Sequence, residues 1–326
     1  LELKSGQVDS LFTLARSLSE FGGMRLGNLS KAARGYRLAS GYQGDEVKPL
    51  AFVDTHPTDS IESCFIQALE HGLAHWHYHE HIYIEKENIE ALQQVREAVY
   101  FIHQTLTVYG DIVPRRATVM LRQELKWLEQ ELSWLNSYEH LEELLDDKGY
   151  ALRKLDARKF LITQLKALEE ALPDREANLK LLHSARYTGV LLDLSRWILA
   201  RGWQPFLDET AQQQIGEAIR PFAAKQLDKT WNELMEAFPA SAQLSSQQYI
   251  DQRYLLVRSL YSGVSFASLY SLEERKSFRM PWADLLQGID DLLAIRPLEQ
   301  FLDTLEYDAQ EQLKRWIIRQ ETSILH

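Results

Sequence analysis

Several features that would narrow the class of protein are missing from this sequence of 326 residues. It has a single cysteine, Cys64, so an intramolecular disulfide is impossible. No apolar run approaches the roughly 20 residues of a membrane-spanning helix, and Leu1–Lys4 lack the charged-then-apolar order of a signal peptide. The chain also lacks an excess of positive charge, since 36 Lys and Arg residues face 47 Asp and Glu residues and the net charge is −11. We therefore expect a cytoplasmic protein that binds neither nucleic acid nor membranes.

Common catalytic and nucleotide-binding motifs are also missing. The chain has no Gly-x-x-x-x-Gly-Lys-Ser/Thr loop, no Gly-x-Gly-x-x-Gly after a strand, no Gly-x-Ser-x-Gly elbow and no His-Glu-x-x-His. Cys64 falls within an apolar helical pattern, which favours a core position over a nucleophile. These motifs therefore give no support to P-loop, dinucleotide-binding, α/β-hydrolase or zinc-peptidase chemistry.

Helical periodicity dominates the chain from about residue 59 onward. Apolar residues are 45% of the sequence, enough for a large core. They recur at three- and four-residue spacing, most clearly at Ile61, Phe65, Leu69, Leu73 and Trp76, and again at Leu92, Val95, Val99, Ile102 and Leu106. Pro114 precedes a further helical pattern and indicates a helix start. The sequence predicts an all-α fold of about ten helices.

The N-terminal residues 1–41 differ from the rest. Leu1–Lys4 alternate as the end of a strand would, although no partner strand follows, and Val8–Phe21 predict an amphipathic helix ended by two glycines. This segment carries a charge of +3, against −14 for the remainder. Residues 42–58 have the composition of a linker.

Several motifs resemble known families. Leu29–Tyr36 resembles the closing motif of CYTH domains. His183–Ile198 is similar to the central Ser-x-x-Arg-Tyr helix of CHAD domains. Gly110–Arg116 and Trp203–Asp208 resemble the bacterial CYTH-CHAD tandem proteins that are inorganic triphosphatases.

This resemblance implies a domain organisation. Residues 1–41 would be the C-terminal remnant of a CYTH tunnel domain, and 42–58 the linker. Residues 59–322 would form the CHAD domain, as two pseudo-symmetric antiparallel helical bundles at about 59–174 and 175–322.

The resemblance also implies a function, which is that of an accessory phosphate- or polyphosphate-binding module of a metal-dependent inorganic triphosphatase. In the CYTH part, Lys31 and Arg34 would bind phosphate and Glu2 would bind Mg²⁺ or Mn²⁺. The family's opening Glu-x-Glu-x-Lys strand and most tunnel strands are absent, so this chain would need the missing CYTH domain in cis and contains no catalytic residue. No cofactor is expected for the CHAD body. Alternatively, Ser30 caps a short turn ended by Gly35, with Lys31 and Arg34 in solvent.

The same resemblance marks basic residues of the CHAD part as phosphate ligands. These are His79, Arg96, His103, Arg115, Arg116, Arg122, Arg186, Arg253 and Arg258. On the helix from Leu92 to Tyr109, Arg96 occupies the family's arginine position. Other positions of the family's basic motif differ, with Gln93, Tyr100, Phe101 and His103 in the first copy and Ile250, Val257 and Leu260 in the second. Arg115, Arg122 and Lys126 form a cationic stripe at spacings of seven and four residues.

Two other interpretations stay open at this stage. The arginines could pair with the abundant carboxylates, which would indicate a structural or protein-interaction domain. A helical metal centre could instead use His71, His75 and His79, which fall within an 80° sector of one helix. The neighbouring His77 and His81 lie on another side, and His79 is expected to be a buried or groove-lining residue.

Overall fold

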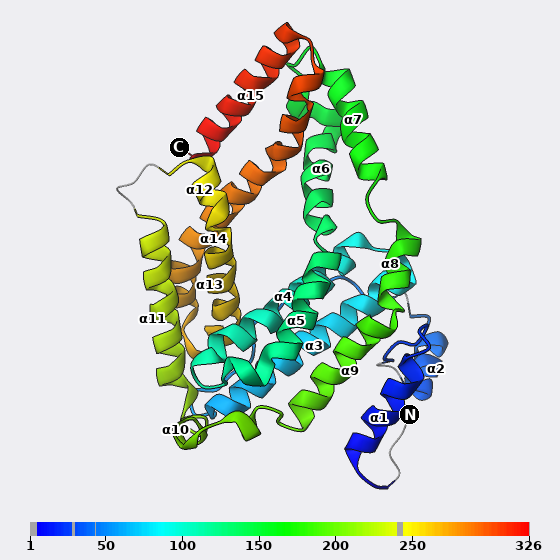
Figure 1. The fold of residues 1–326 in the computed structure, drawn as a ribbon, viewed down its shortest axis with the longest axis vertical. Helices are drawn as coiled ribbons and strands as arrows, with labels where there is room; N and C mark the ends of the chain where they lie inside the picture. Colours follow the sequence, from blue (N-terminus) through cyan, green and yellow to red (C-terminus); the bar gives the residue numbers. More distant parts are fainter. Residues whose placement is uncertain (1–4, 28–29, 43, 240–243, 326) are drawn as a thin grey trace. The chain divides into compact units, whose positions relative to one another are not determined.

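A computed structural model describes residues 5–27, 30–42, 44–239 and 244–325, and it is almost entirely helical (Figure 1). Within these ranges there are fifteen α-helices, and the one β pairing is an isolated bridge between Ser60 and Ala218. The all-α prediction is confirmed. The sequence predicted about ten helices, and short helices account for part of the difference. Examples are α10 (Glu209–Gln214), whose N-cap is the Asp208 side chain, and α12 (Ser246–Asp251), whose N-cap is the Ser245 side chain.

Two further sequence-based expectations concern the N-terminal strand and membrane-spanning helices. The predicted strand at Leu1–Lys4 lies outside the described residues. Among the helices that the structure describes, none combines the length and the hydrophobicity needed to cross a bilayer.

The chain forms two compact units, each assembled from three separate stretches of sequence. The first unit comprises residues 1–132, 173–223 and 264–269, and the second comprises 133–172, 224–263 and 270–326. The bundle limits predicted from the sequence, 59–174 and 175–322, stay predictions.

The first unit is organised around a pair of long helices. Its elements are α1 (Val8–Ser19), α2 (Lys31–Ala39), α3 (Ile61–Lys86), α4 (Ile89–Val108), η1 (Tyr109–Asp111), α5 (Arg115–Glu131), α8 (Arg175–Leu182), α9 (Ala185–Leu199), η3 (Gln204–Phe206), α10, the first turn of α11 (Ile219–Ala237) and η4 (Ala267–Leu269). Among the contacts between helices that the structure describes, those of α3 with α4 are the most extensive. The predicted apolar stripes of both helices face this core, with Leu73 alone half-buried. Helix periodicity therefore identified the central layer correctly.

Aromatic side chains fill the rest of this core. Phe65 contacts Tyr109 and Trp203, with ring centroids 4.9 and 5.2 Å apart. The indole N–H of buried Trp76 donates a 2.6 Å hydrogen bond to the hydroxyl of buried Tyr187. This bond gives both polar groups a partner inside the core, as burial requires.

The N-terminal segment is attached to α9. Arg16 of α1 pairs with Asp193 at 3.2 Å, and Arg196 pairs with Asp9 at 2.6 Å. Further along, the Thr188 hydroxyl donates a 2.6 Å hydrogen bond to the carbonyl of Met24. These contacts place α1 and the chain that follows it against the first unit.

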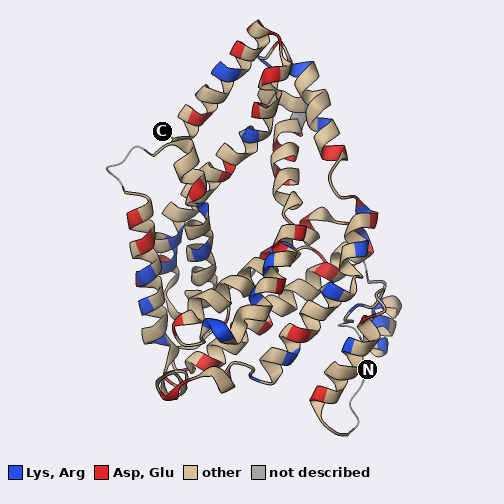
Figure 2. Ribbon diagram, viewed as in Figure 1, with Lys and Arg blue, Asp and Glu red and all other residues tan. Residues whose placement is uncertain are grey.

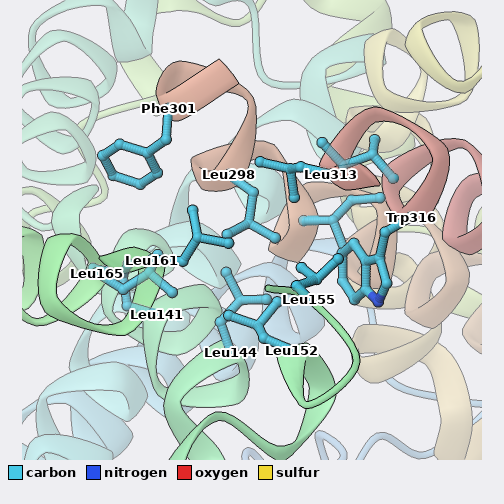
Figure 3. Close-up of a cluster of buried hydrophobic side chains, with 12 residues drawn as sticks. Leu141, Leu144, Leu152, Leu155, Leu161, Leu165, Leu298, Phe301, Leu313 and Trp316 are labelled. Carbon is cyan, nitrogen blue, oxygen red and sulfur yellow. The ribbon is translucent and has the colours of Figure 1, made fainter. Parts of the chain in front are cut away.

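The second unit has two apolar clusters. Its elements are α6 (Trp134–Gly149), η2 (Tyr150–Leu152), α7 (Arg158–Glu170), the remainder of α11, α12, α13 (Arg253–Phe266), α14 (Leu272–Ile295), η5 (Arg296–Thr304) and α15 (Tyr307–Leu325). Figure 3 shows the larger cluster, in which leucines of α6 and α7 meet Leu298, Phe301 and Trp316. The smaller cluster joins α11, α13 and α14 around Trp282. Each cluster buries the apolar faces of amphipathic helices.

Close packing of α3 on α4 depends on Gly72. A methyl group there would lie 2.5 Å from Cγ1 of Ile102. We predict that Gly72→Ala lowers the free energy of unfolding by about 1–3 kcal/mol, because an overpacked core must shift. Urea denaturation followed by circular dichroism measures this.

Gly263→Ala is the matched control, because no atom lies within 4 Å of the added carbon. In a helix this change should be neutral or stabilise by up to about 1 kcal/mol. Equal loss of stability in both variants would contradict the account of the α3–α4 contact.

Candidate functional site

Helix α5 carries a row of cations beside its buried face. Pro114 precedes the helix, as its fixed φ favours. Thr118, Leu121, Leu125 and Leu128 are buried. At about 100° per residue, Arg115, Arg122 and Lys126 fall within a sector of about 40° and span roughly 16 Å. We call these three residues the α5 stripe.

Arg122 is oriented by oxygen atoms that carry no formal charge. Its Nε donates to the Thr118 hydroxyl at 2.9 Å, and one terminal nitrogen donates to the Thr107 hydroxyl at 2.8 Å. The other terminal nitrogen donates to the carbonyl of Leu106. A guanidinium has five N–H donors, so two remain for another acceptor.

The charge of Arg122 is therefore not compensated locally. Burial and the positive charge of Arg115 both lower the pKa of Arg122. Arg115 and Lys126 are exposed, and neither forms an ion pair with any carboxylate that the structure describes. The neighbouring Arg116 donates to the carbonyl of Phe206 at 2.9 Å, again a neutral acceptor. A bound anion would supply the negative charge that this surface lacks.

Arg186 has a different environment. Its guanidinium makes two hydrogen bonds to Glu124 of α5, at 2.8 and 3.3 Å, and lies 4.0 Å from the ring centre of Trp127. The hydrogen bond to Glu124 raises the pKa of Arg186. The segment Ser184–Tyr187 thus has a structural role in this unit, because Ser184 caps α9 and Tyr187 is buried in the core.

Three more predicted ligands are paired with carboxylates. Arg253 contacts Asp290 at 2.6 Å, and Arg258 contacts Glu233. In the first unit, Nδ1 of His103 lies 2.7 Å from Glu129. Figure 2 shows basic and acidic residues interspersed along the helices. An anion would have to displace these carboxylates.

Arg96, which occupies the family's arginine position, is buried on α4 with 8% of its surface exposed. Little of this residue is open to a ligand from solvent. A large polyanion could not reach this side chain without disturbing the core around it.

The second unit contains an acidic cavity beside Arg253. Its volume is ≈ 420 Å³. Glu139, Glu143 and Asp290 line the cavity together with His140 and Arg253. Burial, and then the charges of Asp291 and Asp290, raise the pKa of Glu143. This surface disfavours polyanions.

His79 is neutral in this structure and has no free ring nitrogen. The backbone N–H of Lys48 donates to its Nε2 at 3.1 Å, so its Nδ1 carries the proton and donates to the carbonyl of His75 at 2.9 Å. Burial lowers the pKa of His79. It is a buried polar residue, as expected, and its geometry does not fit a phosphate ligand.

The histidines of α3 do not converge on a metal site. Nε2 of His71 donates to the carbonyl of Ala51, and Nε2 of His75 donates to the side-chain oxygen of Gln94. Among the residues that the structure describes, no group of three or more His, Cys, Asp or Glu side chains could hold a metal ion. Cys64 is buried, and burial raises the pKa of its thiol to about 12, which fits a core residue.

Of the ligands predicted in the N-terminal segment, the structure describes Lys31 and Arg34. Ser30 caps α2 by accepting from the N–H of Ala33, and both Lys31 and Arg34 are exposed. The helix continues through Gly35, so the alternative of a turn ending there was wrong. Glu2 lies outside the described residues. The prediction that Glu2 binds Mg²⁺ or Mn²⁺ therefore stays a prediction.

Sequence reasoning missed the threonines that orient Arg122. Thr118 precedes Arg122 by four residues, a spacing that places the two on one helix face and could have been noticed. Thr107 comes from α4, and no sequence signal connects it with Arg122.

Comparison with known proteins identifies a family and two similar structures. A family model described as "CHAD domain" matches residues 67–318. The chain is similar to the crystal structure of the CHAD domain from the plant Ricinus communis, with a TM-score of 0.63 and 21% identity over 85% of this chain and 91% of that one. It is also similar to PptA from Streptomyces chartreusis, with a TM-score of 0.58 and 17% identity over 82% of this chain and 95% of that one. At these identities the two structures support the fold alone.

The half-buried His75 predicts a dependence of stability on pH. Burial, and then the charge of His79, lower the pKa of His75 from 6.5 to about 4. The unfolded chain therefore binds more protons than the folded one between these values. We predict that stability is fully present above about pH 6.5 and falls as the pH drops toward 4.

An NMR titration of the His75 ring, assigned with a His75→Gln variant, measures the pKa directly. A midpoint near 6.5 would contradict this burial. Chemical denaturation across the same pH range should show a weaker dependence in the variant than in the unmodified chain.

Proposed function

Because this chain belongs to the CHAD family, we propose that it is an accessory phosphate-binding module that takes inorganic polyphosphate or triphosphate. The parent protein would be a cytoplasmic, bacterial, metal-dependent inorganic triphosphatase. In this proposal residues 1–41 complete a CYTH domain supplied in cis, residues 42–58 are the linker, and residues 59–322 are the CHAD domain. The chain alone would be catalytically incomplete.

One observation carries the phosphate-binding proposal, namely the uncompensated charge of Arg122. Its guanidinium is held by three neutral oxygens, keeps two N–H groups and has a lowered pKa. Arginine and phosphate form strong, directional hydrogen bonds, and a fixed guanidinium loses little entropy in forming them. Arg115 and Lys126 extend this surface along α5.

The α5 stripe suits a polymer better than a compact anion. Its cations span roughly 16 Å, so a long polyphosphate can contact all three while a triphosphate contacts fewer. The second unit supports binding less well, because Arg253 and Arg258 are paired and the adjacent cavity is acidic. We therefore assign the main binding surface to the first unit.

The CYTH part of the proposal has weaker support. It rests on the resemblance of Leu29–Tyr36 to a CYTH motif and on the basic character of residues 1–41. Lys31 and Arg34 would contribute phosphate contacts, and Glu2 would help to hold Mg²⁺ or Mn²⁺, in the intact enzyme alone.

A second candidate function is a structural or protein-interaction domain. The specific observation in its favour is the pairing of Arg186, Arg253 and Arg258 with carboxylates. In that case these residues stabilise contacts between helices, and no polyanion binds.

Replacing Arg122 tests the phosphate-binding proposal. We predict that Arg122→Gln weakens binding of long-chain polyphosphate at least about tenfold, because charge-assisted hydrogen bonds are lost. Binding of the unmodified chain should also weaken as salt rises. Isothermal titration calorimetry at low and high salt measures both effects.

Lys180→Gln is the control, because it removes one exposed charge from α8 of the same unit. It should change the affinity by less than about twofold. Absence of salt-sensitive binding by the unmodified chain would overturn the proposal and favour the structural role.

Asp290→Asn separates the two candidate functions. If Arg253 is a phosphate ligand held by Asp290, the variant should bind polyphosphate about two- to fivefold more tightly, the scale of an exposed ion pair. If the pair is purely structural, the variant should lose stability without gaining affinity.

Asp291→Asn provides the matched control. It removes the same charge from α14 without releasing Arg253, since Asp291 accepts from Gln287 instead. Equal gains in both variants would point to net charge and not to a freed arginine.

A further inference from the structure

A basic cavity lies between the N-terminal segment and α3, within the first unit. Its volume is ≈ 460 Å³, in the range of small-molecule sites. One wall is formed by Arg25, by α2 and by Tyr42, and the other by the C-terminal half of α3. The lining residues are Arg25, Arg34, Arg37, Leu38, Gly41, Tyr42, His81, Ile84 and Glu85.

The cations of this cavity are unequally compensated. Arg37 is paired with Asp45 at 3.1 Å and lies 4.3 Å from the ring centre of Tyr42. Arg25 is 3.9 Å from buried Glu80, beyond hydrogen-bond distance. Arg34 has no ion-pair partner among the described residues. Arg34 is therefore open to an anion, and Arg25 keeps its hydrogen-bond donors free although its charge faces Glu80.

Glu80 strengthens this interpretation. It is 2% exposed, and its Oε1 has no hydrogen-bond partner among the described residues. Its carboxylate holds Arg25 near the cavity by charge alone, which leaves the guanidinium donors unused.

The surrounding chain fixes both walls. The ammonium of Lys86 donates to the carbonyl of Asp45 at 2.7 Å, and the Tyr78 hydroxyl donates to the carbonyl of Glu46 at 2.8 Å. On the other side, Thr188 holds the carbonyl of Met24, next to Arg25. The cavity is thus a formed feature of the first unit.

We propose that this cavity binds a small phosphomonoester. Its phosphate would contact Arg25 and Arg34, which match phosphate oxygens in geometry and charge. Its organic group would cover Leu38 and Ile84; Leu38 is otherwise 85% exposed. Inorganic phosphate alone would leave most of the cavity unfilled and would bind less tightly.

This site differs from the one implied by the CYTH resemblance. That resemblance pairs Arg34 with Lys31, whereas here Arg34 lines the cavity and Lys31 does not. The site is also separate from the α5 stripe, so neither proposal depends on the other.

Calorimetric titration of the full 326-residue chain with phenyl phosphate tests the proposal. We expect saturable binding that Arg34→Gln weakens at least about tenfold, through loss of charge-assisted hydrogen bonds. Lys31→Gln, on the same helix, should change it less than about twofold. Inorganic phosphate should bind more weakly than phenyl phosphate.

Three results would overturn the proposal: no saturable binding, equal losses in Arg34→Gln and Lys31→Gln, or equally tight binding of inorganic phosphate. Arg122→Gln should leave phenyl phosphate binding unchanged. It thereby distinguishes failure of this cavity from failure of the polyphosphate surface.

Discussion

Charge compensation decides which arginines of this chain can serve a ligand. A guanidinium paired with a carboxylate gains from an anion only what it loses by giving up its partner. Arg122 is free of that exchange, because hydroxyl and carbonyl oxygens orient it without neutralising it. Arg253 and Arg258 are instead neutralised by carboxylates, which an anion would have to replace. The proposed division of labour between the two units follows from this difference.

The fold supplies the geometry that makes Arg122 distinctive. Packing of α5 against α4 brings Thr107 and the Leu106 carbonyl to the guanidinium, and Thr118 closes the arrangement from one turn earlier. Arg186 shows how the same helix uses a carboxylate for structure, since Glu124 ties α5 to α9. One helix thus combines an internal contact with an open cationic surface.

The sequence predicted the helices and their buried faces well, because burial repeats with helical period in Phe65, Leu69, Val95 and Val99. It could not predict which cations are paired. Arg186 and Glu124 are 62 residues apart, and Arg253 and Asp290 are 37 apart, so pairing depends on how distant helices pack. Family resemblance marked both paired and unpaired arginines alike, and only the geometry separates them.

A crystal structure of the chain soaked with tungstate, a heavy-atom phosphate analogue, tests the central claim most directly. The account predicts anomalous density beside Arg122 and Arg115, with the ion pairs of Arg253 and Arg258 intact. Density beside Arg253 and Arg258, with Asp290 and Glu233 displaced and none on α5, would contradict it.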